Sequence, residues 1–273
     1  MENIITLSNF TIREALSRKI IVTFFAVSTF VIIVFGLLFA LVPFEDLRGM
    51  VNASGDDPMD IAGEIVKGIK LFVVAPLFGG GLFLSIFSAS SFIPNMLEKG
   101  SVDLIISKPV SRAQIILGKF LGGSLIVLIN IAYLIISIWL LIGIKFSIWD
   151  ISLLYSIFTI TFTFCSLYSL IILIGVLTQS SIFAMMLSYI IFFVFSPILT
   201  ARDTISVFLD SKIMETLMDI LYYIIPKTSE LGTLTTEIAL GYGIDEYQPI
   251  LTTFGFLVLV LYISIIIFSK KDY

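Results

Sequence analysis

The chain has 273 residues, of which 58% are hydrophobic and only 13% are charged, and its mean hydropathy is +1.10. Soluble globular domains carry about a quarter charged residues, so this composition excludes them and predicts an all-α protein that crosses a membrane several times. There is no histidine, the single cysteine cannot form an internal disulfide, and the net charge is only −4, without a basic cluster among aromatic residues. We therefore expect no metal site in this chain and no nucleic-acid partner.

The first expected element, residues 4–19, is an amphipathic helix that lies in the membrane interface. Ile5, Ile12 and Leu16 share one helical face, and charged side chains lie elsewhere, which is typical of interfacial helices. A plain cytoplasmic leader or the positive flank of a signal peptide is the alternative. Residues 20–42 then form a first span, since about 20 apolar residues suffice to cross, and no small-residue cleavage site follows it.

Residues 43–69 are polar and acidic, which predicts a loop with a short helix. The second span, about residues 70–93, contains Pro76 and three consecutive glycines, which should bend or locally unwind it. Small residues also recur on this span at four-residue steps, and they favour close approach of another helix over contact with a substrate. They are Gly81, Ser85 and Ala89.

Residues 94–119 are charged and separate two strongly apolar stretches, so we expect them to lie outside the bilayer. The next spans are residues 115 or 121 to 142, then 151–177, 182–199 and 250–268. Gly118 and Gly122 form a G-x-x-x-G pair at the start of the third span, a weak signal for helix packing. The fourth span is rich in Ser and Thr. Such hydroxyls favour hydrogen bonds to a neighbouring helix or to their own backbone over a polar path.

Residues 200–249 form a second long segment that does not span. Apolar residues at three- and four-residue steps from Ile205 to Ile224 predict one amphipathic helix, opposed by four charged residues. A charge at the bilayer centre costs about 3 kcal/mol, whereas a Leu or Ile returns only about 0.5 kcal/mol, so this helix cannot cross. Residues 229–240 could form a second short helix.

Charge is distributed unequally between the two sides of this topology. The amino end, residues 94–119, the turn at 178–181 and the carboxyl end carry nine basic and five acidic residues, for a net charge of +4. The other side carries seven basic and fifteen acidic residues, for a net charge of −8. Because basic residues are retained in the cytoplasm, both termini and the 94–119 segment are expected to be cytoplasmic.

Several classes of chemistry lack their residues. No G-x-x-x-x-G-K-[ST] motif occurs, so the chain carries no P-loop and is not expected to be an enzyme. Histidine-based triads are impossible, and no span interior holds a pair of aspartates for an aspartyl membrane protease. No ionisable residue lies near an expected midplane, which argues against secondary transport but leaves a passive channel open.

The Glu98-Lys99-Gly100 step, the run from Ser107 to Arg112 and Gly118-Lys119 resemble the cytoplasmic loop of type-2 ABC (ABC-2) permeases. By that resemblance the loop contains a coupling helix that docks on a separate ATPase, with Glu98 and Gly100 at the contact and Pro109 with Arg112 leading into span three. The coupling residues that it implies are Glu98, Lys99, Gly100, Asp103, Pro109 and Arg112.

The resemblance extends over residues 1–273 as a single permease domain, and the subtype it is most similar to is the permease of nitrous oxide reductase maturation. It implies two permease subunits and two ATPase subunits in a bacterial inner membrane, with ATP and magnesium bound by the ATPase. Substrate would pass between the permeases, and the segment after span five would form part of an outer gate. A non-transporting membrane subunit that acts on an extracytoplasmic partner is the alternative, besides the channel.

Overall fold

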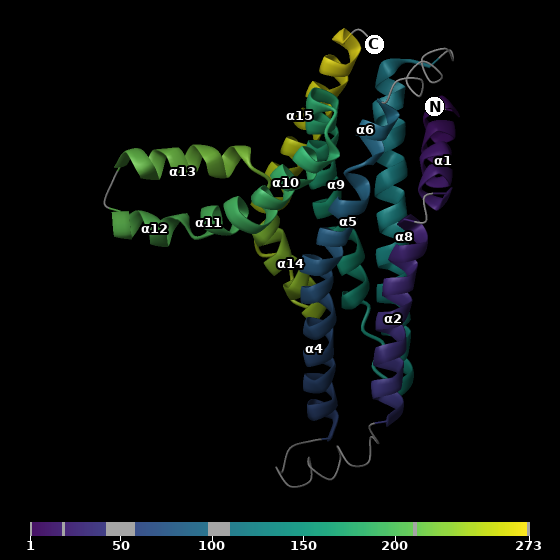
Figure 1. Ribbon diagram of the computed structural model, residues 1–273. Helices are drawn as coiled ribbons and strands as arrows, with labels where there is room; N and C mark the ends of the chain where they lie inside the picture. The colour runs from purple at the N-terminus through teal and green to yellow at the C-terminus, as the bar shows by residue number, and fades with distance from the viewer. Residues whose placement is uncertain (1, 18–19, 42–57, 98–109, 210–211, 272–273) are drawn as a thin grey trace.

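The computed structural model describes residues 2–17, 20–41, 58–97, 110–209 and 212–271, and every regular element in these ranges is a helix. Six of the helical stretches are long and apolar enough to cross a membrane, which confirms the all-α, six-span prediction. They run roughly along one axis in an elongated bundle whose two termini lie at the same end (Figure 1). The spans are Val22–Leu41, Gly63–Pro94, Arg112–Phe146, Ser152–Thr178, Ser181–Thr200 and Gln248–Lys270.

The α-helices are labelled in Figure 1, and the second and fifth spans each consist of several consecutive pieces. Two of these pieces, η1 and η2, are π-helical turns within longer helices. The bounds of all described helices are α1 Glu2–Ser17, α2 Ile20–Leu41, α4 Pro58–Pro76, η1 Leu77–Gly81, α5 Leu82–Ala89, α6 Phe92–Met96, α8 Arg112–Phe146, α9 Ser152–Thr178, α10 Ser181–Ile190, η2 Ile191–Phe195, α11 Ser196–Thr200, α12 Arg202–Leu209, α13 Lys212–Ile224, α14 Thr228–Leu240 and α15 Gln248–Lys270.

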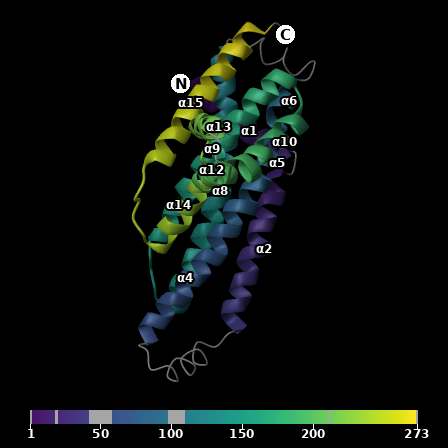
Figure 2. The same cartoon turned by 90° about the vertical axis from the view of Figure 1, so that its left-hand side faces the viewer.

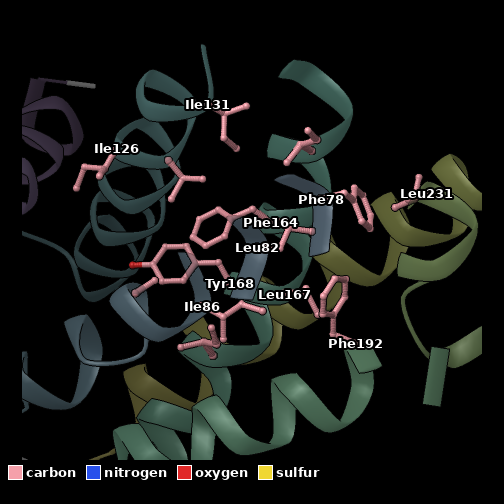
Figure 3. Close-up of a cluster of buried hydrophobic side chains, with 14 of the residues drawn as sticks. Phe78, Leu82, Ile86, Ile126, Ile131, Phe164, Leu167, Tyr168, Phe192 and Leu231 are labelled. Carbon is pink, nitrogen blue, oxygen red and sulfur yellow. The ribbon is translucent and has the colours of Figure 1, made fainter. Parts of the chain in front are cut away.

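Helix α9 is the centre of the bundle, where it packs against α5, α8, α10, α14 and α15. Its aromatic side chains build much of the core, with the Tyr168 ring stacked on Phe164 at 5.3 Å and on Phe120 at 6.0 Å between ring centroids. Figure 3 shows this cluster closed by apolar side chains from the second span, α8, η2 and α14. The chain thus buries one continuous apolar core along its central span.

The hydroxyl groups of α9 bond to their own helix. Ser156, Thr163, Ser166 and Ser169 are buried, and each donates a hydrogen bond to a backbone carbonyl three or four residues earlier. This confirms the preference for backbone bonding over a polar path through the fourth span. Thr161 differs, because its buried hydroxyl has no partner in the part of the chain that the structure describes.

The second span begins earlier than its hydropathy indicates. Helix α4 starts at Pro58, so the short helix expected within residues 43–69 is present over residues 58–69, but it continues without a break into the second span; residues 42–57 lie outside the described ranges. Proline suits the first turn of a helix, where its missing N–H is not needed, and polar residues can stay helical beyond the hydrocarbon. After Pro76 the helix does not break but widens into the π-turn η1, which contains all three consecutive glycines.

The described part of the segment after the fifth span, residues 201–209 and 212–247, contains three helices where two were expected. The predicted single helix 205–224 is divided into α12 and α13, which project sideways from the bundle as a hairpin (Figures 1 and 2). Met218 and Tyr222 of α13 pack on Leu199, whereas Ile213 and Ile220 remain exposed. The expected second helix is α14, and it turns back to pack against α9 and α4.

Candidate functional site: the terminal end of the bundle and its links

The end of the bundle that holds both termini also holds the start of α8, which follows the segment for which ATPase coupling was expected (Figure 1). Glu98, Lys99, Gly100, Asp103 and Pro109 lie outside the residues that the structure describes. The helices on either side are described: α6 ends at Met96, and α8 begins at Arg112. Ser111 and Gln114 form a reciprocal capping box that fixes where α8 starts.

Arg112, the remaining candidate coupling residue, binds within its own chain. Its guanidinium Nη1 donates hydrogen bonds to the carbonyl oxygens of Phe268, Ser269 and Lys271, at 3.0, 3.2 and 2.5 Å. These carbonyls end α15, and a cation there satisfies unpaired acceptors and complements the helix dipole. Arg112 therefore joins the start of the third span to the end of the sixth.

A second cation makes the equivalent link to α9. The Lys271 ammonium donates to the carbonyl oxygens of Val176 and Leu177, at 2.8 and 3.4 Å, in the last turn of α9. No sequence pattern indicated this contact, because Lys271 and its partners are more than 90 residues apart. Arg112 and Lys271 together tie the ends of α8, α9 and α15 to one another at this end of the bundle.

The glycine pair on α8 is where α1 packs. A Cβ atom added to Gly118 would lie 2.5 Å from the Leu7 Cβ, and one added to Gly122 would lie 2.7 Å from the Thr11 Cβ. These distances are shorter than any side chain tolerates, so only glycine admits this close approach. The helix that the sequence assigned to the interface thus lies along α8 (Figure 1).

The buried face of α1 is not its most apolar one. Ser8, Thr11 and Ala15 are buried against the bundle, whereas Ile5 and Leu16 are 62% and 49% exposed. Small side chains pack here because the glycine surface of α8 leaves room only for them. The exposed apolar residues of α1 are then available to the surrounding lipid.

A buried ion pair reinforces this contact. The Lys119 ammonium lies 2.5 Å from a Glu14 carboxylate oxygen, and the two side chains are only 5% and 17% exposed. The same ammonium lies 5.7 Å from the centre of the Phe10 ring, and the Tyr168 hydroxyl donates to the Lys119 carbonyl at 3.2 Å. The pair therefore connects α1 through α8 to the core of α9.

The small-residue stripe of the second span is only partly used for packing between helices. Ser85 and Ala89 are buried, and α5 packs against α9. Gly81 is different, because a Cβ added there would meet the Leu77 side chain of its own helix at 2.8 Å. Close approach occurs instead at Gly175 of α9, where an added Cβ would lie 3.2 Å from the Ile93 side chain, a position that the sequence patterns did not single out.

At the opposite end, a second buried charge links three segments. Lys70 of α4 is 3% exposed and forms an ion pair with Asp150, and its ammonium also donates to the Ser152 hydroxyl at 2.9 Å. Ser152 in turn donates to the Ala239 carbonyl of α14 at 2.9 Å. Burial raises the pKa of the Asp150 carboxyl, but hydrogen bonds from Lys70 and Ser152 outweigh it, so the net shift is downward.

The hairpin is joined to α14 by stacked cations. The Tyr222 ring has the Arg202 guanidinium 3.5 Å from its centre and the Lys227 ammonium 3.4 Å from its centre. Lys227 is 3% exposed, and its ammonium has no hydrogen-bond acceptor among the described residues. Burial therefore lowers the pKa of Lys227, with Arg202 adding to the effect and Glu230 opposing it.

Comparison with known protein families identifies the family to which the chain is similar. Residues 17–273 match the family described as ABC-2 family transporter protein, and this range contains all six spans. The chain matches no individual curated protein. Because the family match covers nearly the whole sequence, including the helices on both sides of the charged 98–109 segment, the chain belongs to the ABC-2 transporter family.

Proposed function

We propose that this protein is the permease subunit of an ATP-driven transporter, with a separate ATPase docking on the segment between α6 and α8. The observation that carries the proposal is the linkage at that end of the bundle. Arg112 and Lys271 join α8, α9 and α15, and the Lys119–Glu14 pair adds α1. A displacement of the docking segment would therefore move four helices together, as transmission of ATPase motion requires.

The orientation and assembly follow from the same proposal. The charge asymmetry favours the termini and the docking segment on the cytoplasmic side of a bacterial inner membrane. A second permease copy or a paralogue would complete the translocation path, and ATP and magnesium would be bound by the ATPase. The nitrous oxide reductase maturation subtype rests only on the sequence resemblance, and no described contact adds to it.

The alternative, a non-transporting subunit that passes ATPase motion to an external partner, draws on the α12–α13 hairpin. This hairpin projects from the bundle (Figure 1) and exposes Ile213 and Ile220. It connects to α14 through the Tyr222 stack, so motion of the bundle would reach it. A passive channel, by contrast, would have no use for a docking segment.

The test is co-purification with the partner ATPase, followed by ATP turnover in lipid. We expect Glu98→Lys and Gly100→Trp to insert and assemble normally but to lose ATPase association or coupling, because charge reversal in a desolvated contact costs several kcal/mol, about 2–5. Glu45→Lys and Asp57→Lys, on the other expected side, serve as matched controls. Normal association and turnover in both loop variants would refute the coupling assignment.

A further inference from the structure

A cavity of about 550 Å³ lies within the single chain, between α2, the second span and α8. It shares Phe24, Val27 and Leu84 with a second cavity of about 380 Å³ that extends to the start of α10, so the two adjoin as one groove. Along α2 the lining runs from Thr23 to Phe35, which is about 18 Å at 1.5 Å per residue. Since the hydrocarbon core is about 30 Å thick, the groove has roughly the depth of one leaflet.

Glycine and the π-turn open this groove. Gly80 and Gly81 of η1 line it, and a Cβ added to Gly80 would meet no heavy atom within 4 Å. Gly80 therefore faces empty space and is not needed for packing against another helix. The remainder of the wall is almost entirely apolar, with Phe30 and Phe72 on facing helices.

The polar groups of the groove are few and are separated along its length. Asn130 and Ser28 are 5% and 3% exposed, and the Ser28 hydroxyl donates to the Asn130 carboxamide oxygen at 3.1 Å. Asn130 lines the cavity, and its Nδ2 group finds no acceptor among the described residues. Hydroxyl groups gather at the other end of the groove, about 8 Å away along α2. They belong to Thr23, Ser88, Ser90, Ser91 and Ser181.

We propose that this groove binds a single-chain amphiphile. Its hydrocarbon chain lies along the apolar wall toward Phe35 and Phe72, a carbonyl or ester oxygen accepts a hydrogen bond from Asn130, and its polar headgroup lies among the hydroxyls near Ser181. Apolar walls alone would not select this ligand, because lipid tails offer the same environment. Selection comes from the buried donor and the hydroxyl-lined end. The binding of an amphiphile by the groove does not depend on the proposed function. A role of the groove as an entry site for transported cargo does rest on the proposed function.

The test uses the purified full chain in dioleoylphosphatidylcholine nanodiscs. The probe is a lysophosphatidylcholine whose 16-carbon chain carries a photoactivatable diazirine. We expect adducts on α2 and α5 residues that line the groove, and competition by unlabelled lysophosphatidylcholine but not by excess dioleoyl lipid. Gly80→Leu should abolish these adducts, and Asn130→Leu should weaken binding about five- to tenfold, as loss of one hydrogen bond does.

Gly255→Leu on α15 is the matched control, because Gly255 also has no heavy atom within 4 Å of an added Cβ but does not line the groove. If Gly80→Leu fails to fold, Val27→Trp fills the groove from α2, where Val27 is 43% exposed. Adducts that persist in the filled variants, or that spread equally over α15, would overturn the proposal in favour of annular lipid. Absence of adducts would overturn it in favour of a second permease copy covering this face.

Adding the unlabelled lysolipid to the complex with the ATPase separates the two proposals. Adducts in the groove without any ATPase association leave the binding site standing and refute the proposed function. Normal ATPase coupling without adducts in the groove would leave the proposed function standing and refute the binding site.

Discussion

At the residue scale, the charged side chains that matter are those which the fold pairs at a distance. Glu14 and Lys119 are separated by 105 residues, yet their side chains form a buried ion pair. At the other end the buried Lys70 pairs with the partly exposed Asp150, 80 residues away. Each pair links a helix to a segment that is far away in the sequence. Removing one partner leaves the other charge buried without compensation.

This reasoning predicts a non-additive pair of substitutions. Lys119→Met alone should lower the thermal stability of the purified permease strongly, because breaking a buried pair costs about 3–5 kcal/mol. Lys119→Met with Glu14→Leu should recover most of that loss, since apolar replacements of similar volume are often neutral. The measurement is the thermal transition in detergent. Equal thermal transition temperatures of the wild type and the single variant would show that the ion pair does not contribute to stability.

At the element scale, the clearest case is α1, whose position depends on two glycines in another helix. Hydropathy identifies α1 as amphipathic and indicates which residues are apolar. It does not indicate that Thr11 and Ala15 are the buried residues, because that choice is made by the glycine surface of α8. The same limit applies to α12 and α13, whose separation no periodicity revealed.

We expect Gly122→Leu to displace α1, because the new side chain would collide with Thr11 and overpacking costs about 1–3 kcal/mol. Ala15, which is fully buried, provides the reporter. In a Cys165→Ser background, Ala15→Cys should be protected from a thiol reagent, and adding Gly122→Leu should make it reactive. Gly255→Leu, with open space around it, should leave it protected. Continued protection in the Gly122 variant would contradict the assigned packing.

At the scale of the whole molecule, both termini and the start of α8 lie at one end (Figure 1). With an even number of spans, that arrangement agrees with the charge asymmetry. Which face of the membrane this end occupies is a separate question, and single cysteines answer it. The positions must be exposed, as Glu246 is, because a buried position such as Thr235 would resist labelling on either side.

In a Cys165→Ser background, we expect Ser54→Cys and Glu246→Cys to react with a membrane-impermeant thiol reagent on intact cells. Ser101→Cys should react only after permeabilisation, because the positive-inside rule assigns it to the cytoplasm. Labelling at residue 101 in intact cells would invert the topology, and with it the proposed side of ATPase docking.

The sequence by itself determined the number and the approximate limits of the six spans. Hydropathy summed over about 20 residues is a local property, and the bilayer imposes it on each helix separately. The sequence also predicts which segments stay outside the hydrocarbon, since a charge there is costly wherever the chain goes next. The sequence did not show that α4 starts at Pro58. Outside the hydrocarbon, polar residues differ little in free energy between helical and non-helical backbone, so hydropathy does not indicate where the helix begins.

Only the tertiary structure decided what each small or polar residue faces. Gly118, Gly122 and Gly80 are alike in sequence, yet the first two admit α1 and the third opens a cavity. In the sequence, Asn130 is simply a polar residue within an apolar span. In the structure, the Ser28 hydroxyl of another helix donates a hydrogen bond to the Asn130 carboxamide oxygen and so orients this group. These roles depend on which helix lies opposite at a distance of a few ångströms, and contacts between residues far apart in the chain leave no trace in local periodicity.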